Sequence, residues 1–162
     1  IQITFSNLMS MYVKFNKGRS ALLKKIRNRF EYIKSFPRLY NLATLFHREL
    51  ATIYQITEII TTNWDDFFER ECGSISIVTD KDFAFWDTPG RKVYKIHGSI
   101  NNIGSIVATT EDYKECNKKL QTGVIGSYLK LLLTTKVILF VGYSFSDEDF
   151  NKIYNFLIVI IL

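Results

Sequence analysis

Cysteine is scarce in this chain, and its scarcity excludes the usual structural metal site. The 162 residues include two cysteines, Cys72 and Cys116, and neither lies in a Cys-x-x-Cys pair or beside a histidine at metal-ligand spacing. We therefore expect no zinc site and no other metal. A disulfide would form only if the fold brought the two residues close together, so free thiols are the simpler expectation.

Long apolar runs are also missing. The longest, at residues 137–141 and 156–162, fall well short of the about 20 residues that a membrane helix needs. The opening residues carry no basic stretch followed by a small-residue cleavage site, so they do not resemble a secretory signal. A hydrophobic content of 47% predicts a folded domain with a sizeable core. We expect a cytoplasmic protein without a membrane partner, and we interpret the apolar run at residues 156–162 as the cut end of a longer polypeptide.

Acidic residues are rare in the first third of the chain, which carries the basic charge. Residues 1–50 hold ten Lys or Arg against two Glu, whereas residues 51–162 hold eleven against fourteen acids. Apolar side chains at helical spacing within the basic stretch predict an amphipathic helix with a cationic outer face, at positions Leu22, Leu23, Ile26, Phe30 and Ile33. We interpret residues 1–36 as a basic helical subdomain with a solvated face. A nucleic-acid or acidic-partner surface is the alternative, which we do not favour.

Helical and strand patterns alternate through the rest of the chain. The predicted helices cover residues 39–54, 64–72, 111–119, 124–134 and a stretch that begins at 147. The predicted strands, short and mostly apolar, cover residues 56–62, 75–78, 93–96, 106–108 and 137–141. Repeated alternation of helix and buried strand favours an α/β fold with a doubly wound, mainly parallel sheet over residues 37–162.

Polar residues follow three of the predicted strands. Thr61 and Thr62 end the first and are followed by Asn63 and Asp65, His97 and Gly98 follow the second, and Gly142, Tyr143 and Ser144 follow the third. Side chains just beyond the carboxyl ends of parallel strands converge on one crevice, so these residues are expected to share a pocket. Each also has a plain structural interpretation: Asn63 and Asp65 as helix caps, His97 as a core residue, and the Gly-x-Ser as an ordinary turn.

The motifs together resemble a known family. Thr-x-Asn-x-Asp at residues 61–65, Lys-x-His-Gly-Ser at 95–99 and Phe-x-Gly-Tyr-Ser-x-Ser-Asp at 140–147 occur in the order found in sirtuin-like NAD-binding domains. The branch they resemble is the zinc-free one of bacterial defence proteins, in which the domain acts as an NAD hydrolase. The likeness covers residues 37–150 and implies a Rossmann-like fold, here an incomplete sirtuin-like domain with a helical N-terminal insertion.

The resemblance also implies roles for individual residues. Asn63 and His97 match the catalytic residues. Thr61 and Asp65 match the motif that faces the nicotinamide ribose, and Gly142 and Ser144 match the turn that contacts the adenosine half. The residues expected to bind the dinucleotide are Thr61, Thr62, Asp65, Gly98, Gly142, Tyr143, Ser144 and Asp147. Tyr143 replaces the small residue usual in protein deacylases, which favours the hydrolase branch.

Physical chemistry supports these roles independently of the resemblance. Cleavage of the nicotinamide glycosidic bond passes through a state like an oxocarbenium ion, so the site needs a polar orienting group and nearby negative charge. Asn63 can orient water or a ribose hydroxyl, and Asp65 can supply charge. His97 can accept a proton near neutral pH. This chemistry requires neither a metal nor a covalent nucleophile.

One departure from the family concerns the phosphate-binding turn. The family begins with a Gly-Ala-Gly-x-Ser turn whose amides hold the pyrophosphate, and this sequence contains no such turn. We expect that the chain starts after this unit and that residues 1–162 alone bind and cleave NAD poorly. The expected partners are NAD and a fused sensor domain or a second copy of the chain, in anti-phage defence by NAD depletion. A non-catalytic NAD or ADP-ribose sensor and a sirtuin-type deacylase or ADP-ribosyltransferase remain as alternatives.

Overall fold

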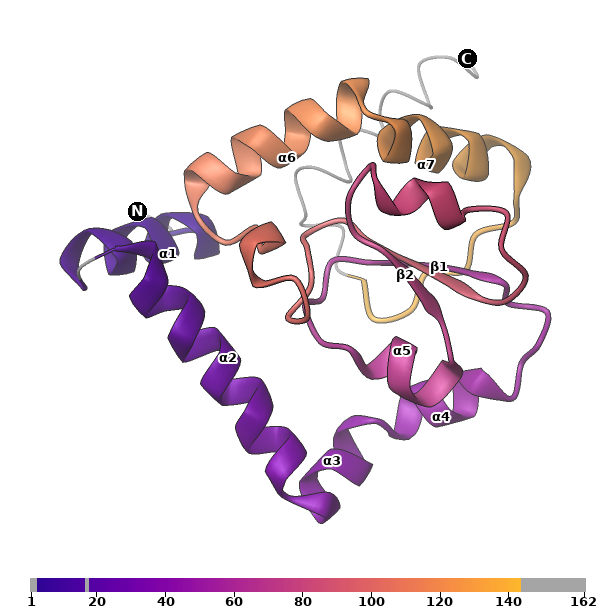
Figure 1. Cartoon of the computed structure of the whole chain (residues 1–162), viewed down its shortest axis with the longest axis horizontal. Helices are drawn as coiled ribbons and strands as arrows, with labels where there is room; N and C mark the ends of the chain where they lie inside the picture. The colour runs from indigo at the N-terminus through magenta and orange to yellow at the C-terminus, as the bar shows by residue number, and fades with distance from the viewer. Residues whose placement is uncertain (1–2, 17, 144–162) are drawn as a thin grey trace.

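The computed structural model describes residues 3–16 and 18–143, which form helices around a small sheet (Figure 1). The α-helices are α1 (Phe5–Phe15), α2 (Arg19–Ser35), α3 (Pro37–Ala43), α4 (Leu45–Ala51), α5 (Phe67–Cys72), α6 (Thr110–Thr122) and α7 (Val124–Thr135). The strands are β1 (Glu58–Thr61), β2 (Ile75–Ile77) and β3 (Lys92–Lys95), and the short 3-10 helices are η1 (Asp82–Phe85) and η2 (Ile103–Ser105).

The three strands form a parallel sheet in the order β1-β3-β2. In the register, Thr61 of β1 lies opposite Lys95 of β3, and Ile77 of β2 lies opposite Tyr94. The central strand β3 is buried at all four positions, as parallel strands covered on both faces usually are. The prediction of an α/β fold with a parallel sheet is therefore confirmed.

Helices cover both faces of the sheet. On one face, Tyr94 and Ile77 pack with side chains of α6 and α7, including Leu120 and Leu129. On the other face, Val93 and Ile59 pack with Phe68 of α5 and with Leu50 of α4. Figure 1 shows α6 and α7 above the sheet and α4 and α5 below it. Successive side chains of β3 thus point to opposite faces of the sheet, and each face is covered by helices. This is the doubly wound arrangement that the sequence predicts.

Two expected strands are not strands in the structure. Residues 106–108 are buried, but their backbone meets the end of β3 only through a hydrogen bond from Val107 N to His97 O, 2.9 Å long, among the described residues. Residues 137–141 belong to no strand of the described sheet, and Val137 and Leu139 are 102% and 74% exposed. An apolar, β-branched run becomes a strand only where another strand offers it an edge, and local pattern does not report that.

The expected helices have different bounds in two places. The predicted helix over residues 39–54 is divided into α3 and α4 at Thr44, which is fully buried and whose hydroxyl donates to the Tyr40 carbonyl at 3.0 Å. The helix predicted from residue 64 begins instead at Phe67. Both differences arise from short polar side chains that bond the local backbone and so compete with regular helix hydrogen bonds.

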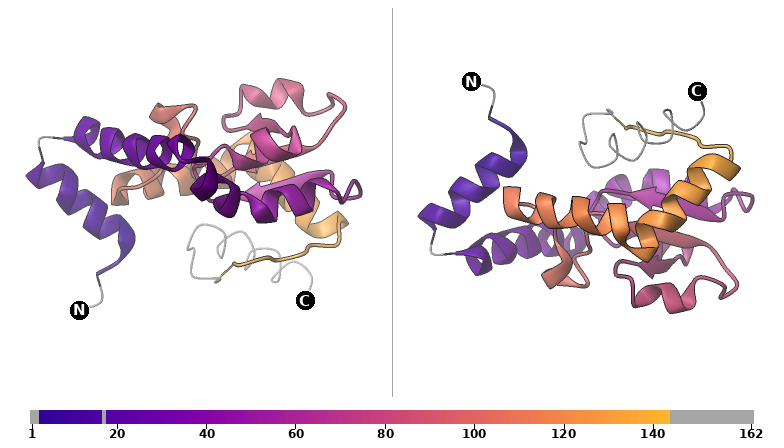
Figure 2. Two further views of the ribbon diagram at one scale, coloured as in Figure 1. Left: turned by 90° about the horizontal axis from the view of Figure 1, so that it is seen from below. Right: turned by 90° about the horizontal axis from the view of Figure 1, so that it is seen from above.

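The predicted amphipathic helix of the basic region is α2, and it lies across the segment that follows β3. Leu22 is 3% exposed and packs with Ile100, Ile106 and Ala108. Figure 2 shows α1 and α2 meeting at an angle at one end of the molecule, opposite the end that holds α7. In the described part of the chain, no helix has both the length and the apolar character needed to cross a bilayer.

Ion pairs attach α2 at both of its ends. Arg19 binds the Asp112 carboxylate at the start of α6, and Lys34 Nζ lies 3.1 Å from Asp66 Oδ2, just before α5. Burial acts to raise the pKa of both carboxyl groups, but hydrogen bonds outweigh it. For Asp66 these come from Arg70 and Lys34, and for Asp112 from Arg19 and the backbone around Thr109, so both pKa values lie below 3.8.

Acid should therefore loosen α2. Both carboxyl groups have a lower pKa in the folded than in the unfolded chain, so their stabilisation is complete at neutral pH. It is lost as the pH falls below 3.8 and through the folded-state pKa values. We expect the free energy of unfolding to fall by about 2 kcal/mol over this range, measured by urea titration. Asp66→Asn should lower stability at neutral pH and flatten the acid dependence; an unchanged dependence would contradict this account.

Candidate functional site

The candidate site lies where β1 and β3 end side by side. Ile96 N donates to Thr61 O at 3.0 Å, and Ile100 N donates to Trp64 O at 2.8 Å. The two segments therefore remain joined by backbone hydrogen bonds beyond the strands themselves. Because Asn63 follows Thr61 and His97 follows Lys95 by the same two positions, both residues are carried to the same edge of the sheet.

Asn63 is the exposed member of this group. Its backbone N–H donates to Thr61 Oγ1 at 3.1 Å, which fixes a tight bend directly after β1. Its side-chain amide forms no hydrogen bond to any residue in the described ranges, so the capping interpretation does not apply to it. Thr62, between these two residues, is half-buried. The bend therefore presents an amide with both donors and an acceptor available to a ligand.

Asp65 is held more firmly. It is 9% exposed, and its Oδ1 accepts a hydrogen bond of 3.1 Å from the backbone N–H of Phe67 at the start of α5. The N-cap residue of α5 is Asp66, which forms no side-chain cap, so Asp65 forms a local turn just before the helix rather than its cap. The bond also fixes the direction of the carboxylate at the strand-end bend.

His97 lies beneath this edge rather than on the surface. It is 3% exposed, and its ring packs edge to face against Tyr113 of α6, with 4.9 Å between the ring centres. Its backbone carbonyl accepts from Val107, which ties the segment after β3 to the chain before α6. The imidazole is consequently held in one orientation by packing, as a positioned proton acceptor requires.

A glycine is required at position 98 because the backbone of Ser105 lies directly against it. Its φ of +87° is one that side-chain-bearing residues rarely adopt, and a Cβ at this position would lie 2.2 Å from the Ser105 carbonyl oxygen. Ser99 N donates to Ser105 Oγ at 3.0 Å and fastens the same loop. The sequence interpretation gave Gly98 a role in ligand approach, whereas in the structure residues 98–105 fold back on it.

The third motif is described only in part. Gly142 has a φ of +61° and open space around it, as a glycine turn predicts. Tyr143 is half-buried and packs against the core cluster that includes Tyr94 and Ile96. This places Tyr143 against the layer of core between β3 and helices α6 and α7. Ser144 and Asp147 lie outside the described residues.

Lys95 and Glu69 form a buried support that sequence reasoning missed. Lys95 Nζ lies 3.0 Å from Glu69 Oε1 and also donates to the backbone carbonyl of Asp65. The Lys95 side chain is fully buried, and that of Glu69 is 16% exposed. This link connects the end of β3 to the bend that carries Asn63 and Asp65. A lysine inside an otherwise apolar strand was the available signal, but its partner could not be inferred from sequence spacing.

Removing the Glu69 carboxylate should lower the stability of the fold. Glu69→Ala leaves a buried ammonium without its counter-charge, and we expect the free energy of unfolding to drop by about 3–5 kcal/mol in urea titrations. The matched control is Glu111→Ala, because Glu111 pairs with Lys114 at 3.3 Å while 74% exposed. That change should alter stability by less than about 0.5 kcal/mol. Similar losses in the two variants would show that the buried pair does not fasten the bend.

The remaining histidine and the two cysteines have structural surroundings. His47 is 9% exposed and packs edge to face on Phe67 and Phe68, and burial lowers its pKa. Cys72 packs in the cluster with Val93, whereas Cys116 packs in the cluster with Tyr94, so the thiols lie on opposite faces of the sheet and form no disulfide with each other. Within the described ranges, no three His, Cys, Asp or Glu side chains gather as a metal site would require.

Comparisons with known proteins agree on one family. The model of the SIR2-like domain matches residues 57–159. A protein named NAD(+) hydrolase ThsA from Cytobacillus dafuensis is 35% identical over 114 residues, covering 66% of this chain and 22% of that protein. The protein of the same name from Bacillus cereus (strain MSX-D12) is 27% identical over 156 residues, covering 91% of this chain and 30% of the relative. Defense-associated sirtuin 2 of Bacillus subtilis is 24% identical over 104 residues, covering 60% and 10%.

Proposed function

Because the chain belongs to the family of SIR2-like domains, we propose that it is part of an NAD hydrolase and cleaves NAD to nicotinamide and ADP-ribose. Relatives with the name NAD(+) hydrolase ThsA support this, although the chain spans only 22% to 30% of their length. The observation that carries the proposal is the pairing of β1 with β3. It brings Asn63, whose side-chain amide bonds none of the described residues, and His97, with its fixed ring, to one edge of a parallel sheet.

In the proposed reaction, the bond between C1′ of the ribose and the pyridinium nitrogen breaks. Its electron pair goes to nicotinamide, which leaves as a neutral molecule. The ribose passes through a state like an oxocarbenium ion, and a water oxygen then bonds to C1′. Asn63 orients the water or the ribose hydroxyls, and His97 accepts the proton that the water releases. The Asp65 carboxylate, fixed by its bond to Phe67, stabilises the positive charge that develops on the ribose.

The other motif residues are proposed to hold the rest of the dinucleotide. Thr61, Thr62 and Gly98 would border the nicotinamide ribose at the ends of β1 and β3. The stretch that opens with Gly142 and Tyr143 would contact the adenosine half, together with Ser144 and Asp147. Lys95 acts as a positioning residue, because it holds the bend through the Asp65 carbonyl.

The test is product formation by the full-length protein. Incubation with NAD and separation of the products by liquid chromatography should yield nicotinamide and ADP-ribose in equal amounts, and a parallel incubation with NADP defines the substrate range. Binding of NAD without nicotinamide release would overturn the proposal in favour of a sensor. Nicotinamide release only in the presence of an acylated peptide or an acceptor protein would identify a deacylase or a transferase instead.

A role in anti-phage defence is the cellular part of the proposal. Relatives named as a defence-associated sirtuin and as NAD hydrolases support it. We propose that the chain acts on the NAD of the cytoplasm and that a fused sensing region or a second copy controls it. The NAD content of infected cells should fall when the intact gene is present, and it should be maintained in cells that carry Asn63→Ala.

A further inference from the structure

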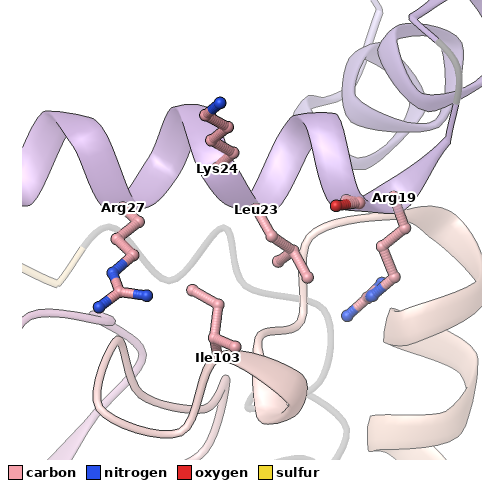
Figure 3. Close-up of a pocket in the computed structure, with 6 residues that line it drawn as sticks. Arg19, Leu23, Lys24, Arg27 and Ile103 are labelled. Atoms are coloured by element: carbon pink, nitrogen blue, oxygen red, sulfur yellow. The ribbon is translucent and has the colours of Figure 1, made fainter.

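A groove runs along α2 and contains none of the residues proposed to bind NAD. Its volume is about 360 Å³, and it is lined by Arg19, Ser20, Leu23, Lys24 and Arg27 of α2 and by Ile103 of η2 (Figure 3). A hollow of about 240 Å³ shares Arg27 and Ile103 with it and extends to Lys34 and Asn101. The size of the first groove is in the range of small-molecule sites.

The groove has an apolar floor between cationic ends. Figure 3 shows Leu23 and Ile103 facing each other, with the guanidinium groups of Arg19 and Arg27 extending on either side of them. The walls are fixed, because Leu22 and Ile100 pack beneath the groove in one buried cluster. Such a floor suits a flat or apolar body, and its ends suit a negative charge.

Some cationic side chains of the groove have ion-pair partners and others do not. Arg19 is already bound to Asp112 and to the Ile106 carbonyl, and Lys34 is bound to Asp66. By contrast, Arg27 has no ion pair or hydrogen bond to any residue that the structure describes, and the same holds for Lys24. The segment that faces α2, residues 99–105, contains no charged residue. Glu31, which lines the smaller hollow, pairs with Lys34 at 4.0 Å, so among the described residues no carboxylate is paired with Arg27.

We propose that this groove binds a small molecule with a phosphate group on a flat body, as in a nucleoside monophosphate. The phosphate bonds the guanidinium of Arg27, and the base lies on Leu23 and Ile103. A guanidinium offers two parallel donors to phosphate oxygens, which makes arginine the preferred partner for this group. The site is additional to the proposed NAD site and does not depend on NAD cleavage.

A single phosphate fits the groove better than a nucleic-acid strand does. A strand needs a row of free cations along its backbone. On α2, however, Lys25 lies over the Tyr12 ring at 5.3 Å and Arg29 lies over the Tyr32 ring at 5.8 Å. Neither lines the groove. Among the residues that the structure describes, Arg27 is the one guanidinium that lines the groove without a partner, and it is enough for one phosphate group.

The test is calorimetric titration of the full-length protein with AMP. Arg27→Ala should weaken AMP binding by about tenfold or more, since it removes a charge-assisted hydrogen bond. The matched control is Arg29→Ala, which removes an equal charge two residues away on the same helix and should leave the affinity within about twofold. Thermal unfolding should be the same for both variants, because both side chains are exposed.

Three further results decide the matter. Inorganic phosphate should bind more weakly than AMP, and Ile103→Ala should weaken AMP but not phosphate, because the floor contacts only the base. AMP binding with the same affinity and the same number of sites in Arg27→Ala as in the wild type would overturn the proposal, as would an absence of AMP binding. A single-stranded RNA that binds more tightly than AMP and is weakened equally by Arg27→Ala and Arg29→Ala would also overturn it. Nicotinamide release should be unaffected by Arg27→Ala, so this test fails or succeeds independently of the hydrolase proposal.

Discussion

Asn63→Ala and His97→Ala, each made in the full-length protein, are expected to lower the rate of nicotinamide release by about 10²- to 10⁴-fold. Asn63 offers the one side-chain amide at the bend after β1, and it has no partner in the described residues that could take over its role. His97 is 3% exposed and held against Tyr113, so a water or another side chain cannot easily replace its ring. The measurement is chromatographic quantification of nicotinamide at saturating NAD.

Controls must separate lost chemistry from lost folding. Asn101→Ala removes an exposed amide four residues after His97 and should keep full turnover. Because His97 is buried, its alanine variant leaves a cavity, so His97→Asn provides a second variant that keeps a polar group in the same place. The assignment requires that His97→Asn unfold at nearly the wild-type temperature and remain inactive. Wild-type turnover in Asn63→Ala or in His97→Asn would exclude that residue from catalysis.

Gly98→Ala is expected to destabilise the protein strongly. The added Cβ would lie 2.2 Å from the Ser105 carbonyl oxygen, far inside contact distance, and the backbone there has a φ of +87°. Either the loop over residues 98–105 moves away or the end of β3 does, and the change should lower the free energy of unfolding by about 3–5 kcal/mol. Since His97 precedes this position, nicotinamide release should be lost as well.

Gly104→Ala is the matched control within the same loop. A Cβ at Gly104 would have as its nearest neighbour an Asn102 side-chain oxygen at 4.0 Å, which is ordinary contact. Urea titration should therefore show little change for Gly104→Ala, and its NAD turnover should remain. If the two alanine variants lost equal stability, the close approach at Gly98 could not be the cause.

Much of the fold could be predicted because its signals are local. The apolar spacing of the basic region predicted α2, and the helix predicted over residues 111–119 is α6. In the structure Thr109 caps α6, in a reciprocal box with Asp112. The short β-branched runs gave β1, β2 and β3, and their separation by helices predicted parallel pairing. In each case the pattern that predicts the element lies within the residues of that element and its immediate neighbours.

The remaining features depend on residues far apart in the sequence. Residues 137–141 have the composition of a buried strand, yet they are not in the described sheet, because pairing needs a partner edge. The Lys95–Glu69 pair likewise depends on tertiary packing, because its two residues lie 26 positions apart. At the candidate site, the rule on strand ends correctly placed Asn63 beside the segment of His97. It could not predict that the imidazole is buried against α6, or that the backbone of Ser105 fills the space beside the Gly98 Cα.

The complete burial of β3 has a consequence for how this protein can evolve. Neither face of Lys92–Lys95 opens to water, and its two lysines point their ammonium groups at backbone carbonyls. A substitution at any of these positions alters the packing of both layers of helices or of the bend after β1. We therefore expect such a substitution to be tolerated only together with a compensating one. We expect this strand to diverge most slowly among descendants, while the solvent-facing side of α2 drifts freely except at Arg27.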